Sequence, residues 1–139
     1  MSDVQALEDA NARFYAAFAE QDLAGMDDAW AQEAAVACIH PGWPVLIDRA
    51  RIMTSWHAIL GDLPGGEAPE VSCADPHSTI VGTVGYVICK ERVGPHTLLA
   101  TNVFVLEGGQ WRLVHHHAAP VYADKAPIDE DEEPSAPLN

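Results

Sequence analysis

The amino-acid sequence predicts an α+β domain in which three helices come first and a four-stranded antiparallel meander follows. Apolar residues recur at helical spacing up to about Leu60, whereas from Glu70 onward the pattern changes to that of strands. Glycine-containing turns separate the strand candidates, and such short connections join antiparallel neighbours. We therefore expect one domain over residues 1–123, with the helices packed on one face of a mostly antiparallel sheet.

The first helix is expected to begin at a capping box, in which Ser2 and Gln5 satisfy free backbone N–H groups of the first turn. It continues to about Glu20, because Phe14 and Phe18 lie on one apolar stripe. Tyr15 lies beside this stripe.

Two further helices are expected before the strands. Asp22 is a plausible cap for a short second helix, and Asp48 caps a third helix that runs to about Leu60. Between them, the apolar run at residues 34–39 predicts a short strand. Residues 61–69 contain two prolines and three glycines and are predicted to form a loop.

Four strand candidates complete the domain, at residues 70–81, 84–93, 97–107 and 110–121. The last of them contains three consecutive histidines. Successive side chains of a strand point to opposite faces, so His115 and His117 share a face with Trp111 and Leu113. We expect this face to look inward and His116 to lie on the outer face. A buried face that changes from apolar to polar predicts a pocket at one end of the core.

The charge of the chain excludes several classes of partner. The formal net charge is −14 with only seven Lys and Arg, so nucleic acid and anionic membranes are not expected to bind. No apolar run approaches the ~20 residues of a membrane span, and the acidic N-terminus does not fit a signal peptide. We therefore expect a cytoplasmic protein whose three cysteines are reduced. Residues 124–139 hold six acids and one lysine and are expected to be a disordered acidic tail.

Several motifs follow one another in an order that resembles the SnoaL-like branch of the NTF2-like superfamily. They are Phe14…Phe18, Met26…Trp30, Cys-Ile-His-Pro-Gly-Trp at 38–43, Ser-Trp at 55–56 and Trp-Arg-Leu-Val-His-His-His at 111–117. The resemblance covers about residues 4–121 and implies a curved sheet wrapped by helices into a cone with an internal pocket. Members of that superfamily include steroid isomerases, polyketide cyclases, dehydratases and proteins without catalysis. The fold alone therefore does not decide the activity.

His40 and His117 are the candidate catalytic residues. His40 ends an apolar run and precedes a rigid turn, so it can project into the cone as a general base with a pKa near neutrality. The alternative is a histidine that only hydrogen-bonds to local backbone. The carboxylate base and tyrosine-plus-acid oxyanion hole of the steroid isomerases have no secure match here, and Asn102 stands where an acidic partner would be expected.

The candidate substrate-binding residues are Tyr15, Trp43, Trp56, Asn102 and His115. The two tryptophans could line the pocket mouth, although large aromatics more often fill the core, and for Trp56 the core is favoured. Asn102 is an amide among apolar residues, so it needs a partner such as a ligand, water or a histidine. The same holds for Tyr15.

No metal site and no cofactor are expected. His115 and His117 would lie about 7 Å apart on one strand face. Contiguous histidines are not a recognised ligand spacing, however, and paired Cys/His motifs or a helical His-x-x-x-His are absent from the sequence. Hydrogen bonds from these imidazoles to a substrate oxygen are the favoured interpretation.

Two functions remain open from the sequence. The first is an isomerase, cyclase or dehydratase that acts by proton transfer on a small apolar carbonyl compound. The second is a non-catalytic ligand-binding or dimerisation module. The resemblance also implies a two-fold homodimer. Its interface is expected on the outer face of the sheet, where the candidates are Val81, Val87, Val103, Val105 and Val114.

Overall fold

The computed structural model describes residues 3–61 and 70–121. The chain begins with helices α1 (Asp3–Ala19) and α2 (Leu23–Ala29), strand β1 (Ala37–Ile39) and helix α3 (Arg49–Gly61). Four long strands follow: β2 (Val71–Val81), β3 (Val84–Val93), β4 (His96–Glu107) and β5 (Gln110–Pro120). The predicted α+β class and element order are confirmed. The expected capping box at Ser2, most of the loop at 61–69 and the acidic tail lie outside the described residues.

Aspartate caps explain where α2 and α3 begin. The Asp22 carboxylate accepts a hydrogen bond from the backbone N–H of Gly25 at 2.9 Å. The Asp48 carboxylate accepts one from the backbone N–H of Arg51 at 2.8 Å. Each bond satisfies a donor that has no partner inside the first helical turn, as the sequence predicts.

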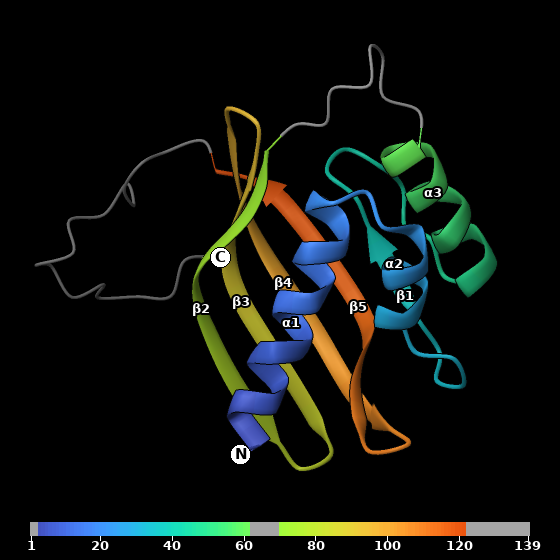
Figure 1. Cartoon of the computed structure of the whole chain (residues 1–139), viewed down its shortest axis with the longest axis vertical. Coiled ribbons are helices and arrows are strands. Elements are labelled where there is room, and N and C mark those ends of the chain that lie inside the picture. The colour runs from blue at the N-terminus through green and yellow to red at the C-terminus, as the bar shows by residue number, and fades with distance from the viewer. Residues whose placement is uncertain (1–2, 62–69, 122–139) are drawn as a thin grey trace, which may run out of the picture.

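The strand order is β1-β5-β4-β3-β2, in which β1 runs parallel to β5 and every other neighbouring pair is antiparallel (Figure 1). The four-stranded meander is confirmed. The place of β1 at the edge was not predicted, because the connection from β1 to the meander is too long for its sequence to fix a neighbour. This pairing sets Ile39 opposite His117, so the chain leaves β1 at His40 beside the histidines of β5.

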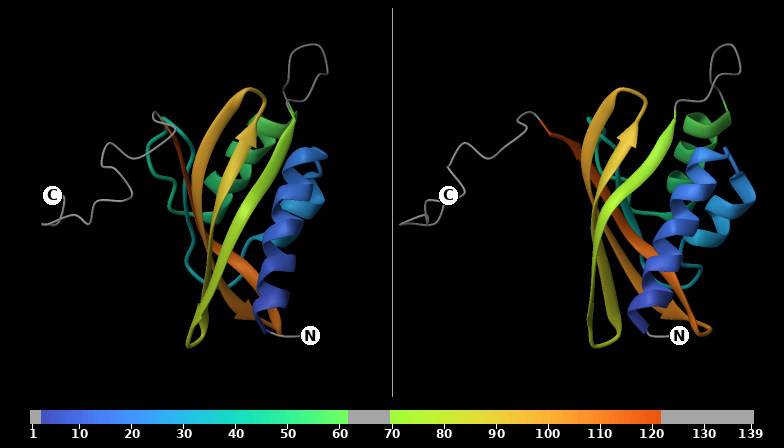
Figure 2. Two further views of the ribbon diagram at one scale, coloured as in Figure 1. Left: turned by 90° about the vertical axis from the view of Figure 1, so that its left-hand side faces the viewer. Right: turned by 60° about the vertical axis from the view of Figure 1, so that its left-hand side comes forward.

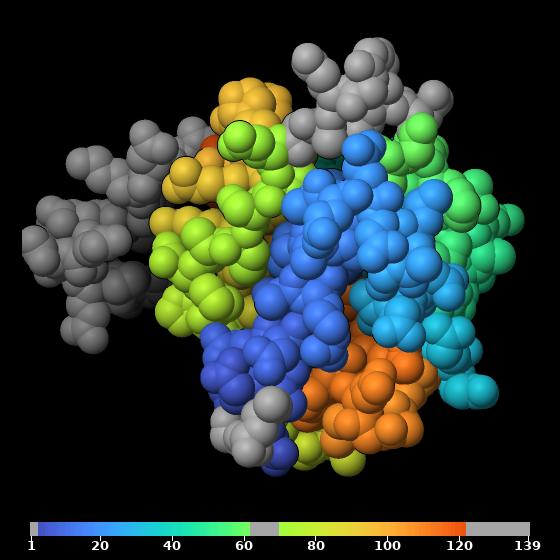
Figure 3. All heavy atoms as spheres, in the orientation of Figure 1, coloured from blue at the N-terminus to red at the C-terminus, as the bar shows by residue number. Residues whose placement is uncertain are grey.

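All three helices lie on one side of the sheet, and no helix of the described chain covers the other side (Figure 2). In the space-filling view α1 and α2 pack side by side over the covered face (Figure 3). Between this layer and the sheet lies the core, whose largest fully buried apolar side chains are Trp30, Trp56, Phe14, Phe104, Leu7, Met26, Ile52 and Leu113. Burying one such side chain contributes about 1.5–3 kcal/mol. None of the described helices is long and apolar enough to cross a membrane.

A β-bulge interrupts β5 near its middle. Val103 of β4 pairs with His115, but the next residue, Phe104, pairs with Leu113. Val114 therefore has no partner in the ladder. Between these two pairs, β5 advances by two residues while β4 advances by one. The bulge reverses the inward and outward alternation along the remainder of the strand.

The expected facing of the histidines is wrong as a result. Trp111 and Leu113 face the core as predicted, but beyond the bulge it is His116 that is buried, at 1% exposure. His117 is exposed and His115 is half-buried on the outer face. Strict period-two alternation does not hold through the bulged Val114, and no proline or glycine marks this position in the sequence.

One residue of β3 also lies on the face opposite to the expected one. Val87 was expected on the outer face, but it is fully buried. It alternates in register with Cys89 and Glu91, which are also buried, so these three side chains point toward α1 and the core. The other four valines expected on the outer face are exposed or half-buried, namely Val81, Val103, Val105 and Val114.

The close approach of α1 to β3 yields a test of the packing. A Cβ atom added at Gly85 would lie 2.8 Å from both methyl carbons of Leu7, which is itself fully buried. We expect Gly85→Ala to lower the free energy of unfolding by about 1–3 kcal/mol, measured by urea denaturation, because the core has no room for the methyl group. Gly61→Ala is the control, since nothing lies within 4 Å of its added Cβ. Equal stability of Gly85→Ala and the natural chain would contradict this packing.

Candidate functional site

A pocket of about 660 Å³ opens at one end of the sheet, under the last turn of α1. Its volume is in the range of small-molecule sites. Apolar side chains form most of its wall, and three buried titratable groups, His40, Glu91 and His116, line it together. The full lining consists of Phe18, His40, Pro41, Trp43, Ile59, Glu91, Val93, Pro95, His96, Thr97, Leu98, His116, Pro120 and Val121.

Strand pairing brings these three groups together from distant parts of the chain. Glu91 comes from β3, His116 from β5 and His40 from the residue after β1. Because β1 lies beside β5, the imidazole centroids of His40 and His116 are 6.4 Å apart. The Nε2 atom of His116 lies 3.8 Å from Oε2 of Glu91. The pocket therefore holds a connected set of potential proton donors and acceptors.

The hydrogen bonds of His40 assign its tautomer. Its Nε2 lies 2.8 Å from the hydroxyl oxygen of Ser55, and this hydroxyl donates its only proton to the backbone carbonyl of Ile52 at 2.6 Å. Ser55 must then accept a hydrogen bond from Nε2–H, which leaves Nδ1 of the neutral ring without a proton. Burial lowers the pKa of His40 to about 4, so the ring is neutral at pH 7. Nδ1 is thus unprotonated at neutral pH, and the buried Cys38 thiol lies 3.9 Å from it.

Aromatic contacts fix the orientation of the His40 ring. Trp43 and Trp56 contact it in edge-on geometry, with ring centroids 5.0 and 4.8 Å away. Trp43 is 43% exposed and lines the pocket, whereas Trp56 is buried in the core. Trp43 therefore lies where the sequence predicted it, and Trp56 has the alternative role as a core residue.

Glu91 is a buried carboxyl group on the inner face of β3, only 2% exposed. Burial raises its pKa to about 7, although the hydrogen bond from the Tyr15 hydroxyl, at 2.8 Å, opposes the shift. Near pH 7 the group is therefore present both as an acid and as a carboxylate. It was missed in the sequence because Lys90 and Arg92 make the segment look exposed. The sequence signal that could have identified Glu91 is its period-two spacing with Val87 and Cys89, which places all three on one face of the strand.

A chain of hydrogen bonds holds His116 in place. Asn102 donates from its amide nitrogen to Asn11 at 2.9 Å and to the Tyr15 hydroxyl at 3.1 Å, so its Oδ1 is left to accept. This oxygen lies 2.5 Å from Nδ1 of His116, which must carry the proton. The unprotonated Nε2 then faces Glu91. Burial lowers the pKa of His116 to about 3, so the two groups do not form an ion pair at pH 7.

The remaining predicted site residues are divided between the wall behind the pocket and the outer face. Tyr15 and Asn102 are buried in the hydrogen-bond network that supports Glu91 and His116, but they do not line the pocket. His115 and His117 lie on the outer face of the sheet and cannot touch a ligand in this pocket. His116, which was expected on the outer face, lines the pocket in place of these two histidines.

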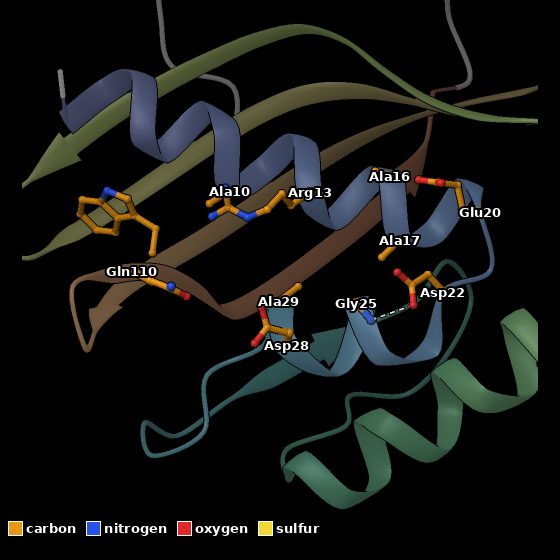
Figure 4. A pocket seen from close by; sticks show the side chains of 11 residues that line it. Ala10, Arg13, Ala16, Ala17, Glu20, Asp22, Gly25, Asp28, Ala29 and Gln110 are labelled. Carbon is orange, nitrogen blue, oxygen red and sulfur yellow. Dashed lines mark hydrogen bonds between the residues drawn. The ribbon is translucent and has the colours of Figure 1, made fainter. Parts of the chain in front are cut away.

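A second hollow, of about 210 Å³, lies between α1, α2 and the start of β5 (Figure 4). Ala10, Ala17 and Trp111 are its buried members, and its charged members, such as Arg13 and Glu20, are exposed. The Asp22 carboxylate that lines it is engaged as the cap of α2. Because no buried titratable group lines this hollow, the larger pocket is the candidate site.

Comparison with known proteins agrees with this fold. A family model described as the SnoaL-like domain matches residues 7–123. The crystal structure of a candidate dehydratase from the NTF2-like family of Streptomyces avermitilis is 30% identical, and the match covers 87% of this chain and 97% of that one at a TM-score of 0.76. The crystal structure of a candidate calcium/calmodulin-dependent protein kinase type II association domain from Thiobacillus denitrificans is 32% identical, covering 82% and 94% at a TM-score of 0.68.

A longer plant protein is also similar. The F-box protein SKIP8 of Arabidopsis thaliana is 24% identical over 122 residues, which make up 86% of this chain. This chain spans about half of that protein's length, at 52%. The similarity therefore concerns one part of the longer protein.

The buried carboxyl group makes stability depend on pH. The pKa of Glu91 is about 7 in the folded chain against an ordinary 4.5, so the folded state retains a proton that the unfolded state has lost between these values. Its contribution to the free energy of unfolding is full below pH 4.5 and is lost as the pH rises through 7, by roughly 3 kcal/mol. Urea denaturation should show the natural chain losing this amount relative to Glu91→Gln between pH 4.5 and 8.

A matched exposed glutamate provides the control. Glu33→Gln changes the same functional group at an exposed position and should follow the natural chain at every pH. Parallel stability curves for the natural chain and Glu91→Gln would contradict the raised pKa of Glu91.

Proposed function

This chain is a member of the SnoaL-like domain family, and we propose that it is a dehydratase that acts on a small, uncharged and mostly apolar β-hydroxy carbonyl compound. One observation carries the proposal: the same pocket holds a base that is unprotonated at neutral pH and an acid that is still partly protonated there. The 30% identical structure described as a candidate dehydratase supports the same class of reaction.

In the proposed reaction Nδ1 of His40 removes a proton from the carbon next to the substrate carbonyl. The electron pair of that C–H bond forms a C=C bond, and the C–O bond to the β-hydroxyl group breaks. The departing oxygen takes a proton from the Glu91 carboxyl group and leaves as water. General acid and general base catalysis of this kind contribute about 10²–10⁴-fold each. Proton exchange with solvent then restores His40 and Glu91.

The supporting residues have distinct roles in this scheme. Ser55 holds His40 in the tautomer that leaves Nδ1 unprotonated. The Tyr15 hydroxyl binds Glu91, and the neutral His116 presents an unprotonated Nε2 to the same carboxyl group. Because burial lowers the pKa of His116 to about 3, this ring stays neutral beside Glu91 and takes no proton from it. His116 replaces His117 as the second histidine of the proposed site.

The pocket lining indicates the class of substrate. No lysine or arginine is among the described lining residues, while Glu91 and the net charge of −14 disfavour anionic ligands. Phe18, Ile59 and Leu98 offer apolar surface to the body of the substrate. Uncharged ketones or aldehydes therefore fit this pocket better than carboxylates or phosphates.

A non-catalytic role is the second candidate. The structure described as a candidate kinase association domain is 32% identical, which supports a binding or assembly module as the alternative. Such a module would use the same pocket for a ligand without turning it over.

We also propose a homodimer formed through the outer face of the sheet. Val81, Ile88 and Leu99 are 64%, 36% and 50% exposed there, and exposed apolar side chains of this kind favour pairing with a second copy. The cytoplasmic location expected from the sequence stays a prediction.

Turnover and binding by matched variants separate the two candidates. A panel of β-hydroxy ketones and aldehydes is screened by thermal shift, and dehydration of those that bind is followed by the absorbance of the conjugated product. We expect His40→Ala and Glu91→Gln to lower kcat by about 10²–10⁴-fold, and His57→Ala on the exposed face of α3 to have no effect. In the natural chain kcat/KM should fall above about pH 7, as Glu91 loses its proton.

Ligands that bind without turnover would favour the non-catalytic module, and full activity of both site variants would contradict the proposed chemistry.

A further inference from the structure

Trp43 differs from the other three tryptophans of the chain in its exposure. Trp30, Trp56 and Trp111 are 0%, 1% and 7% exposed, whereas Trp43 is 43% exposed. It lines the pocket of about 660 Å³, so uncovered indole surface borders the space in which a ligand would bind. Because burial of a large aromatic side chain is favourable, an indole left open at a pocket wall marks a surface that a ligand can cover.

A tight turn holds Trp43 in place. The backbone N–H of Trp43 donates to the carbonyl oxygen of His40 at 2.9 Å, with Pro41 and Gly42 between them. Gly42 has a φ of +80°, so these two residues fit the central positions of a type II turn, which favour proline first and glycine second. Pro44 follows and restricts the backbone further. The indole is therefore positioned before a ligand arrives, which lowers the entropy cost of binding.

The contact between Trp43 and His40 limits where a ligand ring can lie. The two rings have centroids 5.0 Å apart and planes at 73° to one another. Glu91 lines the same pocket from β3, and Phe18 adds a second aromatic ring from the last turn of α1. A ligand ring on Trp43 would thus lie within a few bonds of the carbon atoms on which His40 and Glu91 are proposed to act.

We propose that Trp43 is a stacking platform that makes the pocket selective for aromatic ligands. The preferred substrates are then β-hydroxy ketones or aldehydes that carry an aromatic ring close to the carbonyl group. The reacting groups of this substrate class rest on the proposed function, whereas the preference for an aromatic ring depends only on the wall of the pocket.

An aromatic ring gains more at such a wall than a saturated ring of similar size. Aromatic pairs attract one another beyond the effect of their buried area, by an amount that corresponds to about 2–10-fold in affinity. A saturated ring is bulkier and at least as apolar, so a pocket that selects by hydrophobic burial alone would bind it at least as tightly. The sign of the difference between the two rings therefore distinguishes an aromatic platform from a merely apolar wall.

Two ketones that differ only in their ring provide the test. They are 4-phenylbutan-2-one and 4-cyclohexylbutan-2-one, which are uncharged and lack the β-hydroxyl group, so neither can be dehydrated. By isothermal titration calorimetry we expect the natural chain to bind the phenyl ketone about 2–10-fold more tightly. Trp43→Leu should abolish this preference, and Trp43→Phe should retain part of it. Ile47→Ala is the control, because Ile47 is a 69% exposed residue of the same connection and does not line the pocket.

Acrylamide quenching of tryptophan fluorescence tests the contact without any substitution. Trp43 is the only one of the four tryptophans that is more than 7% exposed, so most of the quenchable emission of the natural chain comes from it. Saturating 4-phenylbutan-2-one should reduce this quenching, because a bound ring covers the indole. Trp43→Phe, which lacks that emission, gives the reference level.

Tighter or equal binding of the cyclohexyl ketone by the natural chain would overturn the platform. So would binding of neither ketone, an unchanged preference in Trp43→Leu, or undiminished quenching with the phenyl ketone bound. Neither measurement involves turnover. A phenyl preference without dehydration of any β-hydroxy carbonyl compound would therefore contradict the proposed reaction alone, and dehydration without the preference would contradict the platform alone.

Discussion

Burial of the Glu91 carboxyl group is the constraint on which the rest of the site depends. An ionised carboxylate loses far more hydration on burial than neighbouring neutral groups restore, so the protein must either protonate it or surround it with donors. Here Tyr15 supplies one donor, and Asn102 binds both the Tyr15 hydroxyl and His116, which places an imidazole beside the same carboxyl group. These side chains come from α1, β3, β4 and β5. The polar network thus ties the helix layer to three strands and fixes the end of the core at which the pocket opens.

The same burial inverts the usual order of proton affinities. A free histidine is a stronger base than a free glutamate, but in this pocket the pKa of His40 falls to about 4 while that of Glu91 rises to about 7. Over the interval between these values the imidazole is unprotonated and the carboxyl group protonated. Two titratable groups whose environments separate their pKa values in this way provide a base and an acid at one pH. In water no single pH leaves a free imidazole mostly unprotonated and a free carboxyl group mostly protonated, so the apolar wall of the pocket is as necessary to the proposed chemistry as the groups themselves.

Much of the fold could be predicted from the sequence, because its signals are local. The caps at Asp22 and Asp48 and the glycine turns between strands fixed the elements, and the motif order indicated the family. The site was less predictable because it depends on register. Because Val114 is bulged, His116 faces the core and His115 and His117 face outward. The bulge is visible only in the pairing of β5 with β4. The period-two alternation of β3 predicts that Glu91 faces inward with Val87 and Cys89. Its charged neighbours Lys90 and Arg92 instead make the segment look exposed. His40 was found because the turn that follows it fixes its position.

The central claim is that Glu91 is protonated well above the range of an ordinary glutamate. Carbon-13 NMR of the side-chain carboxyl groups, recorded across a pH titration on the natural chain and on Glu91→Gln, reports the protonation state of each group through its chemical shift. We expect one carboxyl signal that titrates near pH 7 and is missing from Glu91→Gln. A Glu91 signal that titrates near 4.5 would contradict the account, because the pocket would then hold a carboxylate and no acid at neutral pH.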